Sequence, residues 1–283
     1  QNTLGVQVRQ DHIRVGLYDA TGGQIMSQGT VRDDSVKQTM VGVYGESEIG
    51  WARWMKTIVG LRADQLYADV TSHTLAENSG TSSAFKLSPK FSVILGPWAK
   101  TELFFNTGRG FHSNDARGTT ARIDPKSGLP IDPVPGLVSS KGQEVGIKSQ
   151  LIPNLQTTLA FWQLDFDSEL VYVGDSGNTQ PGRPSRRTGV EWSNHWTLNS
   201  KFLMDVNLAW TTPRYSDLDP VGNYIPNAVE KVANVSLAVR NMGPWSGSVG
   251  VRYIGSAALI EDNSVRSEPS LTVNARVSRK MSD

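Results

Sequence analysis

One stretch of this chain gathers residue types that could bind an anionic small molecule. It covers residues 111–141 and holds arginines, a histidine, acidic residues and four prolines. Arginine suits carboxylates and similar oxyanions because its planar guanidinium donates parallel hydrogen bonds. A structureless segment of roughly 30 residues is usually functional or disordered. These residues could therefore meet an anionic ligand, but the simpler interpretation is a solvated loop whose charges only keep it soluble. The candidate ligand-binding residues are Arg109, Phe111, His112, Asn114, Arg117 and Arg122.

Other groupings that could do chemistry carry weaker signals. The four histidines are scattered and lack the spacing of a metal site. Carboxylate pairs such as Asp165 with Asp167 could do acid–base chemistry, but water-facing charge is the simpler explanation. No Gly-x-Ser-x-Gly turn for a nucleophile is present, and Gly108 and Gly110 lack the third glycine and the helix of a phosphate loop. The sequence predicts no enzyme, no catalytic residue, no protein metal site and no resident cofactor.

Composition narrows the class of protein. The chain has 283 residues, a net charge of +1 and no cysteine, so no basic stripe for nucleic acid is evident and no disulfide framework exists. No stretch approaches 18 uninterrupted apolar residues, which excludes a transmembrane helix but not a transmembrane barrel, whose strands alternate. The first residues have neither a charged start nor an apolar core, so any signal peptide is missing or removed.

Strand-like stretches are joined alternately by tight turns and long polar loops. We expect thirteen strands, of which the first two cover residues 3–10 and 12–20 and the last covers residues 270–279. Tight turns are expected near residues 11, 50–53, 96–99, 152–154, 194–196 and 241–244. Long loops are expected near residues 21–34, 73–81, 111–141, 174–184, 216–227 and 260–269. All tight turns would then lie on one rim of a sheet, as in an outer-membrane β-barrel.

The strands alternate between an apolar and a polar face. Val59, Leu61 and Ala63 oppose Lys56, Arg62 and Asp64, for example. Tryptophans lie in or beside four of the tight turns, where an indole could keep its ring in lipid and its N–H in water. These tryptophans are Trp51, Trp54, Trp98, Trp196 and Trp245. The alternative is that they are ordinary turn-capping residues of a protein core.

Several motifs resemble the barrel of TonB-dependent outer-membrane receptors. Ser88-Pro89-Lys90 precedes a tight turn and a strand that ends Gly108-Arg109-Gly110-Phe111. The family's other strand motifs are matched by Gly60, Arg62 and Asp64, by Glu144, Gly146 and Lys148, and by Gly189 with Glu191. The resemblance implies a barrel of 22 strands with an N-terminal plug domain, in which outer loops and plug bind the ligand. We find no plug, no energy-coupling box and no final aromatic residue, and we count an odd number of strands. Residues 1–283 are therefore expected to be an internal portion of a receptor barrel.

These observations lead to one hypothesis and its alternatives. The fold is expected to be all-β, an antiparallel up-and-down transmembrane β-barrel of about 13 strands, forming an open part of a 22-stranded barrel. The resemblance implies energy-coupled uptake of a ferric siderophore across the outer membrane of a Gram-negative bacterium. Its expected partners are outer-membrane lipid, the plug domain, the TonB complex acting through the missing N-terminal region, and a small-molecule chelate, with no nucleic acid. The alternatives are a porin-like or enzymatic outer-membrane barrel, or a soluble all-β binding protein.

Overall fold

The computed structural model describes residues 1–173 and 178–281 of the chain. Twelve strands form one antiparallel sheet in which each strand pairs with its neighbours in chain order, and a further pair, β8 with β9, forms a separate small sheet. The strands of the main sheet are β1 (Asn2–Thr21), β2 (Gln24–Ala52), β3 (Met55–Ser72), β4 (Gly80–Trp98), β5 (Thr101–Ser113), β6 (Leu137–Ser149), β7 (Leu155–Phe166), β10 (Ser185–Thr197), β11 (Phe202–Tyr215), β12 (Lys231–Met242), β13 (Trp245–Ile254) and β14 (Ser270–Arg279). The small sheet consists of β8 (Leu170–Val173) and β9 (Asn178–Pro181).

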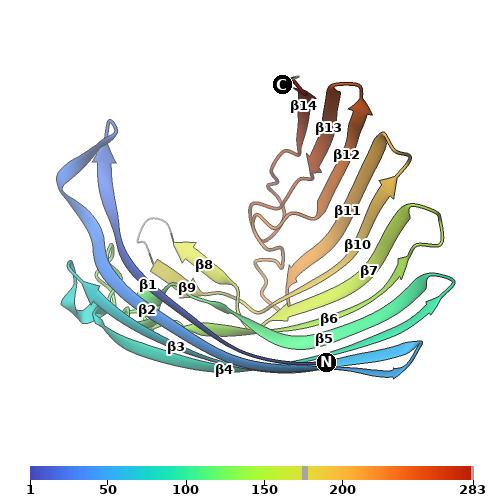
Figure 1. Cartoon of the computed structure of the whole chain (residues 1–283). Helices are drawn as coiled ribbons and strands as arrows, with labels where there is room; N and C mark the ends of the chain where they lie inside the picture. The colour runs from blue at the N-terminus through green and yellow to red at the C-terminus, as the bar shows by residue number, and fades with distance from the viewer. Residues whose placement is uncertain (174–177, 282–283) are drawn as a thin grey trace.

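The main sheet is strongly curved, and its edge strands β1 and β14 do not meet (Figure 1). This confirms the predicted all-β, antiparallel up-and-down fold with an open edge. Two short 3₁₀ helices, η1 (Ala76–Asn78) and η2 (Ala116–Thr119), lie in the connections that follow β3 and β5. Among the described residues, no helix has the length and apolar character needed to span a bilayer.

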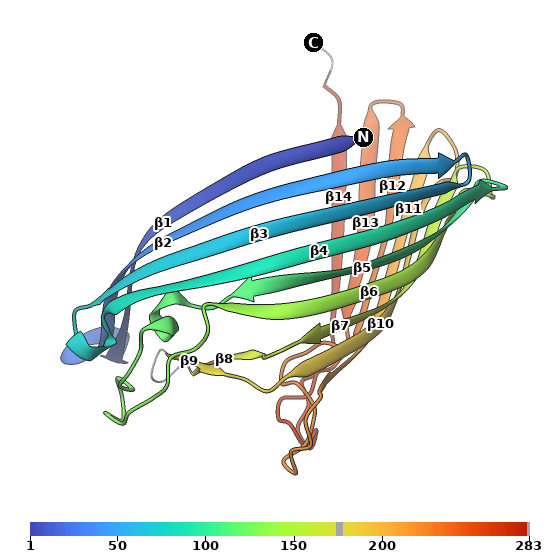
Figure 2. The same cartoon turned by 90° about the horizontal axis from the view of Figure 1, so that it is seen from below.

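Apart from the two-residue connection of β1 to β2, tight turns and long connections lie at opposite ends of the strands (Figure 2). Five short connections, of two to five residues, join β2 to β3, β4 to β5, β6 to β7, β10 to β11 and β12 to β13. We call their end of the sheet the turn rim and the opposite end the loop rim. The five predicted tryptophans lie at or near the turn rim and are all exposed, and the rings of Trp54 and Trp98 stack at 6.3 Å.

The apolar face of the first strands changes side part-way along their length. In β3, Val59 and Leu61 point away from the concave face and are half exposed, whereas Leu66 and Val70, nearer the loop rim, point into it and are buried. The spacing between Leu61 and Leu66 is odd, so the two sets lie on opposite faces of a continuous strand. In β1, Val6 and Val8 are likewise followed by Val15 and Leu17 on the other face.

This switch of the apolar side chains from one face of the strand to the other explains why the sequence pattern predicted a turn that is absent. The turn expected near Asp11 is wrong, because β1 runs without interruption from Asn2 to Thr21. The polar residues around Asp11 mark the switch of the apolar face, which resembles a chain reversal when only the pattern is read. The main sheet has an even number of strands. The expected turn near residue 11 would have placed the start of the first strand at the loop rim, but β1 starts at the turn rim.

The long loop expected at residues 21–34 is also wrong. β1 and β2 continue as a hairpin that ends in a two-residue turn of Gly22 and Gly23. Both glycines have positive φ, at 59° and 82°, which a tight hairpin turn of this kind requires. The loop expected at residues 174–184 is replaced mainly by the β8–β9 hairpin, and residues 174–177 lie outside the described residues.

Candidate functional site

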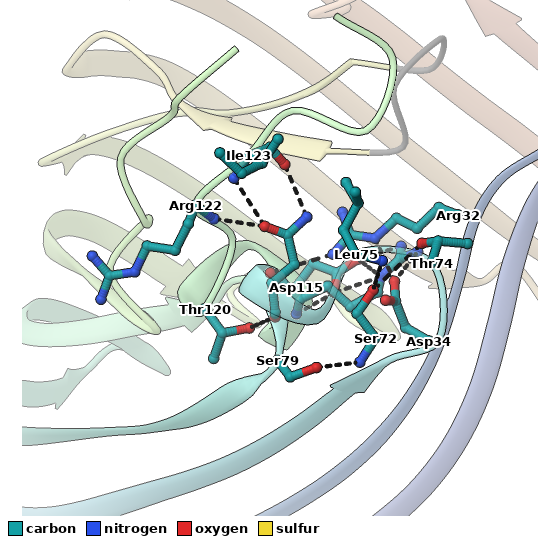
Figure 3. A network of polar contacts seen from close by, with 12 residues as sticks. Arg32, Asp34, Ser72, Thr74, Leu75, Ser79, Asp115, Thr120, Arg122 and Ile123 are labelled. Carbon is teal, nitrogen blue, oxygen red and sulfur yellow. Dashed lines mark hydrogen bonds and ion pairs between the residues drawn. The ribbon is translucent and has the colours of Figure 1, made fainter. Parts of the chain in front are cut away.

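The long connections at the loop rim fold into two polar clusters. The first, here called the Asn78 hub, joins the part of β2 nearest the loop rim with the β3–β4 and β5–β6 connections (Figure 3). The second, here called the Arg183 hub, joins the connections β7–β10, β11–β12 and β13–β14. Together they set the shape of the loop rim above the concave face of the sheet.

Asn78 uses its whole side chain to hold the β5–β6 connection. The side chain is almost fully buried; its amide nitrogen donates to the carbonyl of Ile123 at 2.8 Å, and its oxygen accepts from the backbone nitrogens of Arg122 and Ile123 at 2.8 and 2.9 Å. The hydroxyl of Thr120 adds a bond of 2.8 Å to the Asn78 carbonyl. One asparagine therefore fixes a loop whose sequence position is more than forty residues away.

Buried ion pairs form the other side of the Asn78 hub. Arg32 and Asp34 are paired and are 1% and 0% exposed. Arg117 lies 2.6 Å from Asp115 and also approaches Asp34 at 3.9 Å. Burial raises the pKa of Asp115, but the hydrogen bonds and charge of Arg117, with a smaller contribution from Arg32, outweigh burial and hold that pKa below its ordinary value.

An apolar floor supports this hub. Val36 and Val70 on the concave face pack with Ala116 of η2 in one buried cluster. The residues that fill this floor are thus the ones whose apolar face has switched to the inside near the loop rim. Packing against the β5–β6 connection gives a physical reason for the switch, since inward apolar side chains above the barrel wall would otherwise face water.

The Arg183 hub is built around one guanidinium. Arg183 contacts Asp217 at 2.6 Å and Glu261 at 2.8 Å, donates to the carbonyl of Gly222 at 2.8 Å, and lies 4.3 Å above the ring of Tyr215. The hydrogen bond from Arg183 holds the pKa of Asp217 below its ordinary value. Three connections are therefore joined at a single side chain.

Glu230 provides a second junction beside it. Its two carboxylate oxygens accept from Arg214 at 3.0 Å and from Arg266 at 2.9 Å. Burial raises the pKa of Glu230, but these two arginines outweigh burial and hold it below its ordinary value. Arg214 also lies 3.7 Å above the ring of Tyr224, which ties the β11–β12 connection to the strand that it leaves.

Below the hubs, the concave face carries paired charges. Lys56 lies 3.1 Å from Glu48, Arg62 lies 2.6 Å from Asp64, and Lys90 contacts Glu46. A groove of about 460 Å³ follows this face past Tyr44, Arg62 and Lys90 and reaches residues 109–111, where β4 and β5 are no longer paired. A concave wall with mixed charges of this kind suits a water-filled or plugged lumen.

Comparison with known families decides the identity of the fold. The family model described as TonB dependent receptor-like, beta-barrel, matches residues 1–281. The chain belongs to the TonB-dependent receptor family.

Solved TonB-dependent receptors share the architecture of the chain. The ferric yersiniabactin uptake receptor FyuA from Yersinia pestis superposes with a TM-score of 0.72 at 14% identity over 98% of this chain and 43% of its own length. The copper transporter OprC gives 0.73 at 16% over 99% and 46%, and the ferric citrate transporter FecA gives 0.71 at 15% over 100% and 44%. The chain thus spans less than half the length of these structures, and the likeness concerns the fold.

Barrels of the TonB-dependent receptor family have a known location and orientation in the membrane. TonB-dependent receptor barrels are outer-membrane proteins of Gram-negative bacteria, and the family consists of receptors and transporters. In such barrels, short turns lie on the periplasmic side and long loops outside.

The structure distributes the six predicted ligand residues of this receptor barrel over different surroundings. Arg109 and Phe111 lie on the convex side of β5, and His112 lies on the concave side with its ring 5.5 Å from that of Phe166. Asn114 and Arg117 are buried in and beside the Asn78 hub, whereas the side chain of Arg122 extends away from it and is exposed (Figure 3). Their contact with a ligand stays a prediction.

Sequence reasoning missed most residues that organise the loop rim of this receptor. Asn78, Arg183 and Glu230 each occupy an unremarkable polar stretch, and nothing local distinguishes them from solvated loop residues. Their partners lie from 16 to 78 residues away, so only the tertiary structure brings the groups together.

Proposed function

We propose that the protein is an outer-membrane receptor for energy-coupled uptake of a scarce anionic metal chelate, with a ferric siderophore as its substrate. The observation that carries the proposal is the pair of hubs, which hold long outer loops in defined positions over a charged concave wall. Ordered loops suit ligand capture, because less conformational entropy is lost when a ligand binds. The similar proteins named for ferric chelates and copper support the same substrate class.

His112 and Arg122 are the proposed ligand contacts. Arg122 is exposed on a loop that Asn78 fixes through its backbone, which leaves the guanidinium available for a carboxylate or catecholate oxygen. His112 lies on the concave side at the end of β5. Arg117 and Asn114 would act by holding the loop, not by touching the ligand.

In the whole protein, we propose that a plug domain occupies the lumen and that the TonB complex of the inner membrane acts on it. The paired charges on the concave wall, such as Lys56 with Glu48, offer polar contacts to such a plug. The barrel would supply the scaffold, the outer vestibule and the wall of the conduit.

Uptake by cells tests the proposal. A strain that lacks the gene should lose uptake of at least one chelate from a panel of ferric catecholates, hydroxamates and carboxylates, and the intact gene should restore it. Uptake should also stop when the energy-coupling complex is removed, which a passive porin would not require. Normal uptake of every chelate by the deleted strain, with no binding to the purified protein, would contradict the proposal.

A single substitution tests the role of Arg122. Arg122→Ala should weaken chelate binding by about tenfold, the loss of one charge-assisted contact of about 1.5 kcal/mol. Lys126→Ala, which removes an exposed cation from the same loop, is the matched control and should leave binding within about twofold, since an exposed charge away from the ligand contributes little. Equal losses in the two variants would indicate a general electrostatic effect and not a contact.

A further inference from the structure

The concave face carries different charges at the two ends of the curved sheet (Figure 1). On β2, β3 and β4, the three ion pairs already described join each acidic residue of this face below the Asn78 hub to a cation. The last three strands, β12, β13 and β14, contain basic residues but no acidic residue. This end of the wall therefore has positive charge that its own strands do not balance.

Strand register places Arg252 and Arg276 on the concave face. An unbroken row of paired residues runs across the strands from Glu102 of β5 to Arg252 of β13. Glu102 is an even number of residues from His112 on the concave side of β5, so the whole row lies on that side. Thr272 continues the row on β14, and Arg276 follows it on the same face. A hollow of about 170 Å³ in this face is lined by Arg252, Asp205, Asn207, Asn234, Ser236 and Asn274.

The arginines of this wall lack partners within the chain. Arg240, Arg252 and Arg276 are exposed, and within residues 1–173 and 178–281 none of their side chains has a hydrogen-bond or ion-pair partner. The acidic residue that lines the same hollow, Asp205, already contacts His195 at 2.6 Å. Uncompensated charge of one sign on a concave wall attracts solutes of the other sign. We call the three arginines the arginine strip.

The arginine strip extends from the middle of the wall to the turn rim. Arg252 lies seven residues from Trp245, where β13 begins. Arg276 lies four residues beyond the position opposite Arg252, which is about 13 Å at roughly 3.3 Å per residue, and three residues before the end of β14. Arg240 lies two residues before the end of β12 at the turn rim. An anion on the strip would therefore pass from one arginine to the next along the direction of the strands.

We propose that the arginine strip is a track for an anionic solute on its way through the lumen to the turn rim. Successive weak contacts suit passage, because each site must draw the anion in and then release it to the next. Guanidinium groups suit the carboxylate or catecholate oxygens of such a solute. The ion pairs on β2, β3 and β4 have no excess charge and would not compete for it. This inference rests on the proposed function, in which an anionic chelate enters the lumen, and adds the side of the wall along which it leaves.

Thiol reagents of opposite charge test the inference. Residues 1–283 contain no cysteine, so Asn274→Cys gives this wall a single reporter between Arg252 and Arg276. Ser92→Cys gives a matched reporter on the concave face of β4, beside the ion pair of Lys90. The full-length protein in nanodiscs would react with an anionic and a cationic methanethiosulfonate of similar size, and mass spectrometry of the modified peptide would give the two rates.

The ratio of the two rates reports the local electrostatic potential, because the reactivity of the thiol itself affects both rates equally. The anionic reagent should be favoured at Asn274→Cys about fivefold more than at Ser92→Cys, since unit charges within about 10 Å still act in 0.1 M salt. Arg252→Gln with Arg276→Gln should remove that preference.

Two further variants make the result specific. Arg252→Lys with Arg276→Lys keeps both charges and should keep the ratio. Arg279→Gln removes a cation from β14 at an odd spacing from Arg276, on the other face, where Arg279 lies over the ring of Trp245. It should change the ratio by less than about twofold, because its charge is separated from the lumen by the sheet. Heat-modified electrophoretic mobility would confirm that each barrel is folded.

Four outcomes would overturn the inference. Equal ratios at the two reporters, or a ratio that the double glutamine variant retains, would show no local attraction for anions. No reaction of Asn274→Cys with either reagent would indicate that a protein segment, such as an acidic part of the plug, covers the strip. Loss of chelate binding in the double glutamine variant would place the arginines in the binding site and not on a track. The labelling uses no chelate, so an absence of chelate uptake would contradict the proposed function alone.

Discussion

The Asn78 hub holds its charges out of water, whereas the Arg183 hub keeps them at the surface. Asp34 and Arg32 are 0% and 1% exposed, but the side chains of Arg183 and Asp217 are 17% and 34% exposed. Both clusters join connections that are distant in sequence. The difference shows that one barrel can hold its long connections in two ways. One is by ion pairs buried over an apolar floor, and the other is by partly exposed ion pairs around one arginine. The two hubs should therefore respond differently to mutation, salt and pH.

Removal of the buried carboxylate should have the largest effect. Asp34→Ala leaves Arg32 buried without that partner, and breaking a buried pair in this way typically costs about 3–5 kcal/mol. Hydrogen exchange of the β5–β6 connection should accelerate strongly, while exchange in the β11–β12 connection should not change. If both connections opened equally, the hubs would form one cooperative unit and the comparison would fail.

Loss of the asparagine clamp should have the next largest effect. Asn78→Ala removes three side-chain hydrogen bonds to partly buried backbone groups of Arg122 and Ile123, for an expected loss of about 2–3 kcal/mol. Limited proteolysis should then cut between residues 114 and 136. Asn199→Ala is the matched control, because that side chain also accepts from two backbone nitrogens but at the turn rim. In the Asn199→Ala variant, the loop rim should stay resistant to protease.

The Arg183 hub should be weaker and sensitive to salt. Arg183→Ala should loosen the β11–β12 and β13–β14 connections by about 1–2 kcal/mol, less than a fully buried arginine would, because solvent screens its partners. In molar salt, hydrogen exchange of these connections in the unaltered protein should become faster and approach the rate seen in the variant. The Asn78 hub should show no such change, and an equal salt effect on both hubs would contradict the assignment of burial as the difference.

The smallest effect should come from acid. The pKa of Glu230 lies below its ordinary value of 4.5, so the carboxylate binds its arginines more strongly than it does in the unfolded chain. Its stabilisation is complete above that ordinary value and is lost as the pH falls through the lowered pKa. Exchange of the β11–β12 connection should accelerate below about pH 4. Glu230→Gln should remove that dependence while it leaves exchange at neutral pH only slightly faster.

Asp115 offers the same test in the other hub. Its pKa also lies below its ordinary value of 3.8, so its stabilisation is complete above that value and is lost as the pH falls through the lowered pKa. Exchange of the β5–β6 connection, measured at a series of pH values, should therefore accelerate in acid. Exchange that does not change in acid would contradict a role for the Asp115 carboxylate in holding the first hub.

The sequence by itself determined the strands of the wall and their two faces. Alternation in stretches such as residues 55–63 follows from the two-residue period of a strand, and each turn signal is local, so both can be read without a structure. The same reasoning failed at Asp11, because a change of apolar face and a chain reversal leave similar local patterns.

Only the tertiary structure decided which loop residues act together. Asn78 reaches Ile123, Arg183 reaches Glu261, and Arg252 stands opposite Thr272 through pairings that no local pattern encodes. Strand register and loop packing are set by the sum of many distant contacts, so the positions of these side chains emerge only when the sheet is formed.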